Sequence, residues 1–295
     1  RCLRMMLLSK VFGWLRRRAP APLPDALWQE TIAELPFLRR LDHEEKQRLR
    51  ILTEAFLAEK TFSAAGGLAL TDAMCVAIAA QGCLPILNLG LDYYRGWVGI
   101  IVYPDEFVIP RIVEDESGIV HEYDEVASGE AWADGPLLVS WRDVQMAGNG
   151  YNVIIHEFVH KLDMLDGVID GIPPLPSSAS KPLDPSNKPA APNIVRREWR
   201  QILTAAYEDF CALADEAEAR GEETLFDPYA AEHPGEFFAV MSEAFFETPE
   251  ILYAEYPALY GAFARFYRQN PRARQLAALT EPCPDSSSRA DRTSA

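Results

Sequence analysis

Two histidines, His156 and His160, lie four residues apart in this sequence, and Glu157 follows the first of them. On a helix, positions i and i+4 share one face, so both imidazoles can reach a single metal ion. Zinc binds histidine nitrogen at about 2.0–2.1 Å and suits such a pair. The helix turns Glu157 by about 100° from His156, so we expect its carboxylate beside the metal, as the general base that activates a water. The spacing predicts a zinc-dependent hydrolase, against the alternative of a helix with two unrelated surface histidines.

The residues around this motif are largely apolar, which predicts a mostly buried helix. Within residues 150–165, the apolar positions include 153, 154, 155, 158, 159, 162 and 165. Imidazole and carboxylate groups on a buried helix are costly unless they are paired or bind a metal. The surroundings therefore favour a metal site over two unrelated histidines.

A catalytic zinc needs a third ligand, because such sites use three protein ligands and keep one position open. A second apolar helix is predicted at 234–247, with Pro234 in a natural first-turn position. Glu236 and Glu243 are seven residues apart on this helix and share a face, and His233 precedes it. Residue type and spacing leave all three side chains open as the third ligand.

The chain contains five cysteines, an odd number, and no C-x-x-C pair. This pattern argues against a disulfide framework and against a structural zinc site, which usually has several cysteine ligands. It favours a reducing compartment, so a cytoplasmic location is expected. No apolar run approaches the roughly 18 residues that span a bilayer, so stable membrane insertion is not expected.

The charge of the chain is strongly negative, with a formal net charge of -16 at pH 7. An acidic surface repels phosphate backbones, so nucleic acid is not an expected partner. The first 18 residues differ, because all their charged residues are basic. Residues 1–24 are therefore predicted to be a flexible basic leader outside the folded domain.

Helices are predicted at both ends of the chain and strands between them, which indicates an α+β domain with a small sheet packed against a helical layer. The predicted helices include two within 25–60, one at 71–82 and one at 194–220, and the predicted strands are 84–89, 97–103, 107–113 and 135–141. A single domain is expected at 25–275, made of a helical part (25–82), the sheet and metal helix (83–165), a proline-rich loop (166–193) and a second helical part (194–275). Residues 276–295 are predicted to be a disordered tail.

Several segments resemble the Mlc titration factor A family of zinc peptidases. They are HEFVHKLD at 156–163, DPYAAEHPGEFFAVMSEAFF at 227–246, CLPILNLGLDYYRGWVGIIVYPDEF at 83–107 and GEAWADGPLLVSWRDV at 129–144. The resemblance covers most of residues 25–270, although the loop 166–193 is long for the family. The catalytic part of that family is similar to the protease domain of anthrax lethal factor, so the resemblance implies a zincin-like (gluzincin) domain.

The resemblance also implies roles for individual residues. His156, His160 and Glu236 are implied as the ligands of one zinc ion per chain, and Glu157 as the base. Tyr229 is implied as a phenol that donates a hydrogen bond to the oxyanion formed on the scissile carbonyl.

Two acidic residues are then candidates to orient a ligand histidine. They are Glu243, on the same helix as Glu236, and Asp163, about one turn after His160. An ion pair or a helix cap is an equal alternative for both of them.

The function implied by the resemblance is hydrolysis of peptides, as an aminopeptidase, with an endopeptidase as the alternative. Because the family is named for titrating a transcriptional repressor of sugar uptake, binding to a repressor protein is also implied. The alternative function is a non-catalytic regulatory protein that titrates such a repressor. The intact motif with Glu157, Tyr229 and Glu236 favours a chain that retains catalysis.

Overall fold

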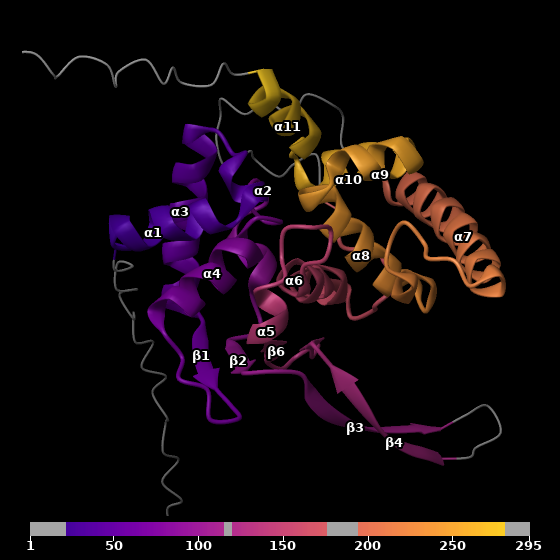
Figure 1. The fold of residues 1–295 in the computed structure, drawn as a ribbon, viewed down its shortest axis with the longest axis horizontal. Coiled ribbons are helices and arrows are strands. Elements are labelled where there is room, and N and C mark those ends of the chain that lie inside the picture. Colours follow the sequence, from indigo (N-terminus) through magenta and orange to yellow (C-terminus); the bar gives the residue numbers. More distant parts are fainter. Residues whose placement is uncertain (1–21, 115–119, 176–193, 281–295) are drawn as a thin grey trace, which may run out of the picture.

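The computed structural model describes residues 22–114, 120–175 and 194–280 of the 295-residue chain. Apart from a short strand at 61–64, which lies between two helices, helices come first, strands follow and helices complete the chain, so the α+β prediction is confirmed. The strands lie on one side of the molecule and the helices cover the other (Figure 1). The predicted leader up to residue 21, the proline-rich residues 176–193 and the tail from 281 lie outside the described residues.

The first helical group supports the sheet and the central helix. It consists of α1 (Asp25–Glu34), α2 (Pro36–Arg39), α3 (His43–Glu59) and α4 (Asp72–Cys83). Asp42 begins α3 by accepting a hydrogen bond from Glu45 N at 2.8 Å, and Glu45 Oε2 accepts one from Asp42 N at 3.1 Å. This reciprocal cap satisfies two backbone donors at the start of α3, which packs against α4.

The main sheet has four strands in the order β1 (Thr61–Ala64), β2 (Gly99–Tyr103), β6 (Leu137–Ser140) and β5 (Gly129–Ala131). β1, β2 and β6 run parallel, and β5 is antiparallel to β6. All four residues of β6 are buried, in agreement with their apolar run. β5 forms an edge of this sheet, and within the described residues its only strand partner is β6.

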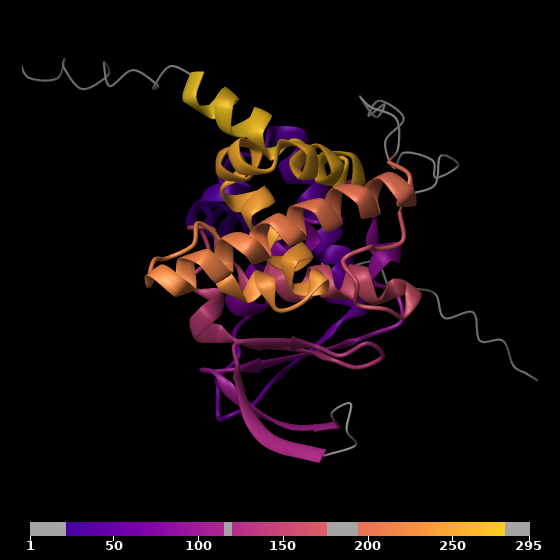
Figure 2. The same ribbon diagram turned by 90° about the vertical axis from the view of Figure 1, so that its right-hand side faces the viewer.

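A separate hairpin projects away from the helices (Figure 1 and Figure 2). It pairs β3 (Phe107–Glu114) with β4 (Val120–Ala127) in an antiparallel ladder. Its base packs on the main sheet through Phe107 and Ile109, which contact Leu138. β4 continues through Ser128 into β5, so the hairpin and the sheet edge form one continuous wall.

The C-terminal helices form a second layer around α8. They are α7 (Arg196–Arg220), α8 (Pro234–Glu247), α9 (Pro249–Glu255), α10 (Pro257–Tyr267) and α11 (Pro271–Thr280). Four of them begin with proline, which has no backbone N–H. This loss is harmless in the first turn, where that N–H would have no partner within the helix. An aromatic cluster holds α7, α8 and α10 together; it comprises Trp199, Phe238, Phe263 and Phe266.

Helix α6 (Val153–Asp163) lies at the centre and packs against α4, α8, β5 and β6. Its fully buried side chains are Ile154, Ile155, Phe158, Val159 and Leu162. The prediction of a mostly buried helix is therefore confirmed. α4 approaches α6 closely at Gly82, where an added Cβ would lie 2.5 Å from Cζ of Phe158. Only glycine permits that approach.

Two local predictions differ from the structure. The run 84–89, predicted as a strand, consists of buried turns, with Leu87 N donating to Leu84 O at 3.2 Å and Leu89 N to Ile86 O at 3.0 Å. Pro85 lacks the donor that a central strand requires, so the apolar run is buried without joining the sheet. Residues 276–280, at the start of the predicted tail, belong to α11.

The structure also bears on membrane insertion. Among the residues at 22–114, 120–175 and 194–280, no helix combines the length and the apolar character needed to cross a bilayer.

Candidate metal centre

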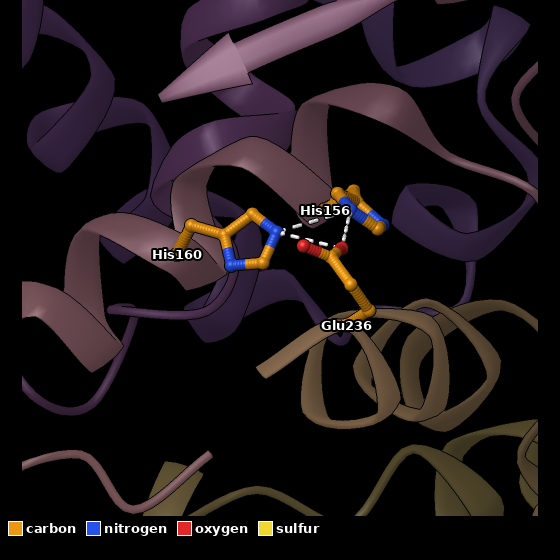
Figure 3. Close-up of side chains that lie close together, drawn as sticks. All are labelled: His156, His160 and Glu236. Carbon is orange, nitrogen blue, oxygen red and sulfur yellow. Dashed lines mark hydrogen bonds and ion pairs between the residues drawn. The ribbon is translucent and has the colours of Figure 1, made fainter. Parts of the chain in front are cut away.

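Helix α6 presents His156 and His160 on one face, toward Glu236 in the first turn of α8 (Figure 3). Asn152 caps α6, because its Oδ1 accepts a hydrogen bond from Ile155 N at 2.9 Å. The cap and the surrounding apolar residues fix the helix, so the two imidazoles project from consecutive turns as their spacing predicts.

The three side chains converge on one point. The two imidazole Nε2 atoms lie 3.1 Å apart, and Glu236 Oε2 lies 3.0 Å from Nε2 of His156 and 3.1 Å from Nε2 of His160. Tetrahedral bonds of about 2.0–2.1 Å separate ligand atoms by roughly 3.3 Å. The three atoms therefore have about the spacing of three corners of a tetrahedral metal site.

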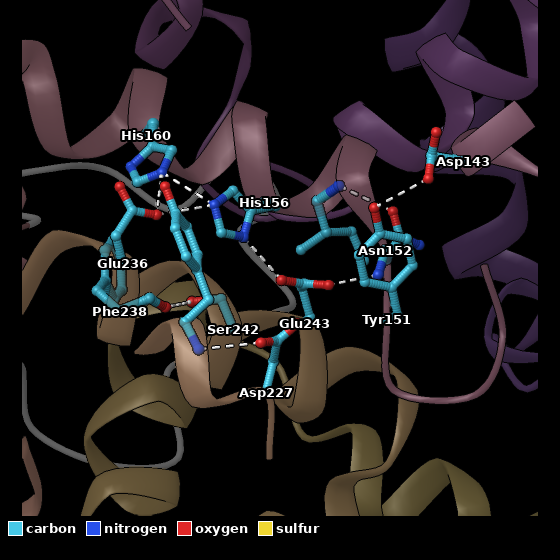
Figure 4. Close-up of polar contacts among 12 residues, drawn as sticks. Asp143, Tyr151, Asn152, His156, His160, Asp227, Glu236, Phe238, Ser242 and Glu243 are labelled. Atoms are coloured by element: carbon cyan, nitrogen blue, oxygen red, sulfur yellow. Dashed lines mark hydrogen bonds and ion pairs between the residues drawn. The ribbon is translucent and has the colours of Figure 1, made fainter. Parts of the chain in front are cut away.

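A further carboxylate on α8 orients the first histidine (Figure 4). Glu243 Oε1 lies 2.8 Å from Nδ1 of His156, and Glu243 Oε2 accepts a hydrogen bond from Asn152 N. Glu243 is 3% exposed. A carboxylate on Nδ1 fixes the imidazole plane and leaves Nε2 to face Glu236 and His160.

Asp163 takes a different position from Glu243. It is fully buried, and its Oδ2 accepts a hydrogen bond from Gly171 N at 2.8 Å. Within the described residues, Asp163 Oδ1 and His160 Nδ1 have no hydrogen-bond partner. Asp163 therefore ties down the segment that follows α6, and no hydrogen bond between it and His160 is present in this part of the chain.

The imidazoles and carboxylates of the cluster shift each other's pKa values. Burial lowers the pKa of His156, but hydrogen bonds with Glu236 and Glu243 raise that pKa well above its usual value. Burial raises the pKa of Glu236, whereas its hydrogen bonds with the two histidines bring it well below the ordinary range. The carboxylate of Glu236 is therefore charged, which is the state that a metal ligand requires.

Glu157 lies beside the cluster and against the edge strand. It is 5% exposed, and an added Cβ on Gly129 would lie 2.6 Å from its Cγ and 2.7 Å from its Cδ. Burial raises the pKa of Glu157 to about 7, although the charges of His156 and His160 act to lower it. Such a carboxyl group can accept and release a proton near neutral pH.

Tyr229 approaches the histidines from a separate 3-10 helix, η3 (Pro228–Ala231). Asp227 caps this turn by accepting a hydrogen bond from Tyr229 N at 3.0 Å. The phenol ring centroid lies 6.2 Å from that of His156, and the side chain is 40% exposed. Burial, and then the charge of Glu236, raise the pKa of Tyr229, so its hydroxyl remains a hydrogen-bond donor at neutral pH.

These residues line a cavity of about 400 Å³ between α6, α8, η3 and the wall formed by β4 and β5. Within the described residues, no lysine or arginine lines it. Its acidic lining residues are Glu125, Glu130, Glu157, Asp227, Glu236 and Glu243. The cavity therefore attracts positively charged groups.

The structure distinguishes among the three side chains that the sequence offered as the third metal ligand. It brings Glu236 to both Nε2 atoms and Glu243 to His156 Nδ1, whereas His233 Nδ1 accepts a hydrogen bond from Gly235 N at 3.1 Å and caps α8. Sequence reasoning missed Tyr151 and the wall residues 125–131 of the cavity. The only signal for the wall was the run GEAW at 129–132, which carries no motif of its own.

The chain is similar to known proteins over most of its length. The chain matches the family described as glucose-regulated metallo-peptidase M90 over residues 12–268. Mlc titration factor A of Serratia proteamaculans (strain 568) is 40% identical over 253 residues, covering 84% of this chain and 89% of that protein. Proteins of the same name from Edwardsiella ictaluri and Salmonella arizonae are 39% and 38% identical and cover 88% and 85% of this chain and 93% of their own lengths.

The family resemblance seen in the sequence is thereby confirmed. The matched region includes every element that carries the cluster, from β5 and α6 to η3 and α8. Since the match spans most of the chain, and the relatives are similar over most of their own length, the chain belongs to the family of glucose-regulated metallo-peptidases M90.

Proposed function

We propose that this chain is a zinc-dependent peptidase that hydrolyses peptide bonds in the cavity beside α6. The observation that carries the proposal is the convergence of His156 Nε2, His160 Nε2 and Glu236 Oε2 from two helices onto one tetrahedral site. Zinc suits this donor set of two imidazoles and one carboxylate, with a fourth position left for water or substrate. Zinc bound there would polarise the scissile carbonyl and lower the pKa of a coordinated water.

Glu157 is the general base in this proposal. Its carboxylate lies on α6, between the histidines and the edge strand, and has a pKa raised to about 7 by burial. It accepts a proton from the attacking water and returns that proton to the leaving amine. Gly129 leaves the space that the carboxylate fills, so the glycine is part of how the base is positioned.

Tyr229 stabilises the oxyanion in this proposal. Its hydroxyl stays protonated at neutral pH, and its ring stands beside His156 at the rim of the cavity. A phenol donor directed at the developing negative charge contributes most in the transition state. Exposure of the side chain leaves it free to adjust when a substrate enters.

The substrate class follows from the cavity walls. β5 is an edge strand beside Glu157, and an extended peptide can pair with such an edge through its main chain. The acidic lining, which includes Glu125 and Glu130 on the wall, suits the ammonium group of a free peptide N-terminus. The edge strand suits any extended peptide, whereas the acidic lining favours an aminopeptidase over an endopeptidase.

A comparison of two substrates and two proteins tests the proposal. Zinc-loaded wild type and zinc-loaded Glu157→Gln are assayed on an alanine-linked chromogenic substrate and on its N-acetylated counterpart. Glutamine keeps the shape of the side chain and removes the base, so kcat should fall by about 10²-fold or more while zinc stays bound. Acetylation removes the ammonium charge and should lower kcat/KM in wild type. Equal rates for the two proteins would remove Glu157 as base, and equal rates on the two substrates would favour an endopeptidase.

We also propose a second function, binding of a transcriptional repressor, as the relatives' name Mlc titration factor A suggests. The formal net charge of -16 suits a partner with a basic surface. The free cysteines Cys75, Cys83 and Cys211 agree with a cytoplasmic location for both functions. Co-purification of a repressor with Glu157→Gln would support binding without cleavage, and its absence for both proteins would remove this function.

A further inference from the structure

Helix α8 presents three carboxylates toward α6, and only two of them serve the histidines. Glu236 and Glu243 contact the imidazoles, and Glu247 follows one turn later on the same face. Glu247 is 2% exposed and has no part in the proposed mechanism. A buried carboxylate at this position requires a reason, because burying its charge is costly without partners.

The partners of Glu247 are neutral donors from the loop that precedes α6. Gly148 N lies 2.9 Å from Oε1 and 3.0 Å from Oε2, and Gly150 N lies 2.7 Å from Oε2. The nearby cation Arg40 donates to the backbone carbonyl of Glu247 at 2.9 Å. Both glycines have left-handed backbone, with φ of 124° at Gly148 and 97° at Gly150. A loop of this kind has little stiffness of its own, so the carboxylate fixes its path.

Asn152 connects this loop to the metal centre. Its Nδ2 donates to Glu247 Oε1 at 2.8 Å and to Gln81 Oε1 at 2.9 Å, while its Oδ1 caps α6. Its backbone N donates to Glu243, and Glu243 contacts His156 Nδ1. A continuous chain of hydrogen bonds therefore runs from Glu247 through Asn152 and Glu243 to His156 (Figure 4 shows its central part).

We propose that Glu247 is a positioning residue for the metal centre, which holds Asn152 and, through it, Glu243 and the first turn of α6. This inference rests on the metal site proposed above. Because Glu247 fixes the amide of Asn152, the backbone donor of Asn152 stays aimed at Glu243, and Glu243 keeps Nε2 of His156 directed at the metal. Groups that orient a ligand in this way set the metal affinity as well as the activity.

Glu247→Gln is the direct test, because glutamine has the same size but replaces one carboxylate oxygen, which accepts hydrogen bonds, with an amide nitrogen that donates them. The affinity for Zn²⁺ alone is measured on metal-free protein by competition with a chromogenic chelator. The measurement is made at pH 8, above the pKa of about 7 to which burial raises Glu247. We expect zinc binding to weaken by about tenfold. An unchanged affinity in folded Glu247→Gln would overturn the proposal.

Ser242→Ala is the matched control on the same helix. Ser242 is fully buried, donates to Phe238 O at 2.7 Å and lies 2.8 Å from the hydroxyl of Tyr267 on α10. This variant also loses a buried hydrogen bond on α8, so its melting temperature should fall, but its zinc affinity should stay within about twofold of wild type. An equal loss of zinc affinity in the control would show general loosening of α8 and would overturn the positioning role.

Asn152→Ser covers the case in which Glu247→Gln fails to fold. Serine still caps α6 but cannot reach Glu247 with an amide, so zinc affinity should again fall by about tenfold. Wild-type affinity in this variant would overturn the proposed chain of contacts. No substrate enters any of these measurements. If wild type binds zinc but cleaves no peptide, the proposed peptidase function is excluded and the positioning role of Glu247 is not. If wild type binds no zinc, both proposals are excluded.

Discussion

Gly129 on the edge strand is a position where the addition of a single methyl group should lower kcat strongly. Its backbone is outside the left-handed region, so alanine is compatible with the strand conformation. The added methyl group would meet Cγ of Glu157 at 2.6 Å and Cδ at 2.7 Å, and Oε1 more closely still. Ordinary contact begins at 3.4 Å, so the carboxylate must retreat by roughly 0.7–1 Å.

A displacement of this size has a predictable effect on the rate. Misplacing a reacting group by about 1 Å can lower the rate by about 10²-fold, equivalent to about 2.7 kcal/mol in activation free energy. We therefore expect zinc-loaded Gly129→Ala to lose about 10²-fold in kcat on the alanine-linked substrate. Its zinc content should equal that of wild type, because the three atoms nearest to the added methyl group all belong to Glu157 and to none of the ligands.

Gly99→Ala is the control, because it adds a methyl group to β2 of the same sheet, where the Cβ would lie 3.2 Å from Cβ of Pro136. This position has no contact with Glu157, and kcat should stay within about threefold of wild type. A loss of thermal stability in Gly129→Ala with an unchanged kcat would mean that β5 moves and Glu157 does not. That result would refute the reasoning, as would equal losses in the two variants.

Three further predictions concern the metal, the phenol and pH. Removal of zinc by a chelator should lower the melting temperature by roughly 10 °C, because the ion binds only the folded cluster. The comparison is made by calorimetry with protein in zinc at about 1,000 times its dissociation constant, and an unchanged melting temperature would argue against the site. Tyr229→Phe should lower kcat by about 10²-fold with KM and zinc content little changed, in steady-state assays, since the phenol acts on the transition state; a change confined to KM would contradict this role. Burial raises the folded-state pKa of Glu247 from 4.5 to about 7, so the folded state holds this proton more tightly than the unfolded state. The stability of metal-free wild type relative to Glu247→Gln should therefore fall as pH rises from 5 to 8, by at most about 3 kcal/mol in urea denaturation, and a pH-independent difference would exclude the shift.

The helices that carry the cluster could be predicted from sequence, because their apolar periodicity and end signals are strong. α6 and α8 have nearly the predicted bounds, and α7 ends at Arg220 as predicted, directly before Gly221 with φ of 67°. The choice among Glu236, Glu243 and His233 could not be made from spacing, since all three lie on or beside one helix. It depends on how α8 packs against α6, which is a tertiary property.

The strands were harder to predict for two different reasons. β5 has only three residues, Gly129–Ala131, and β4 is interrupted by acidic residues, so neither shows a clear apolar alternation. The run 84–89 has the composition of a buried strand but forms buried turns, because burial and strand pairing have the same sequence signature. The wall of the cavity was therefore the part of the site that sequence reasoning missed.

The two helices that share the cluster come from opposite sides of the proline-rich segment. His156 and His160 precede residues 176–193 and Glu236 follows them, at separations of 80 and 76 residues along the chain. The chain is anchored on both sides of this segment by buried residues, Ile172 and Ile194. Neither half of a chain divided within the segment would contain the site, and two such halves would regain it only by associating. The metal centre therefore exists only where the parts of the chain before and after this segment pack against each other.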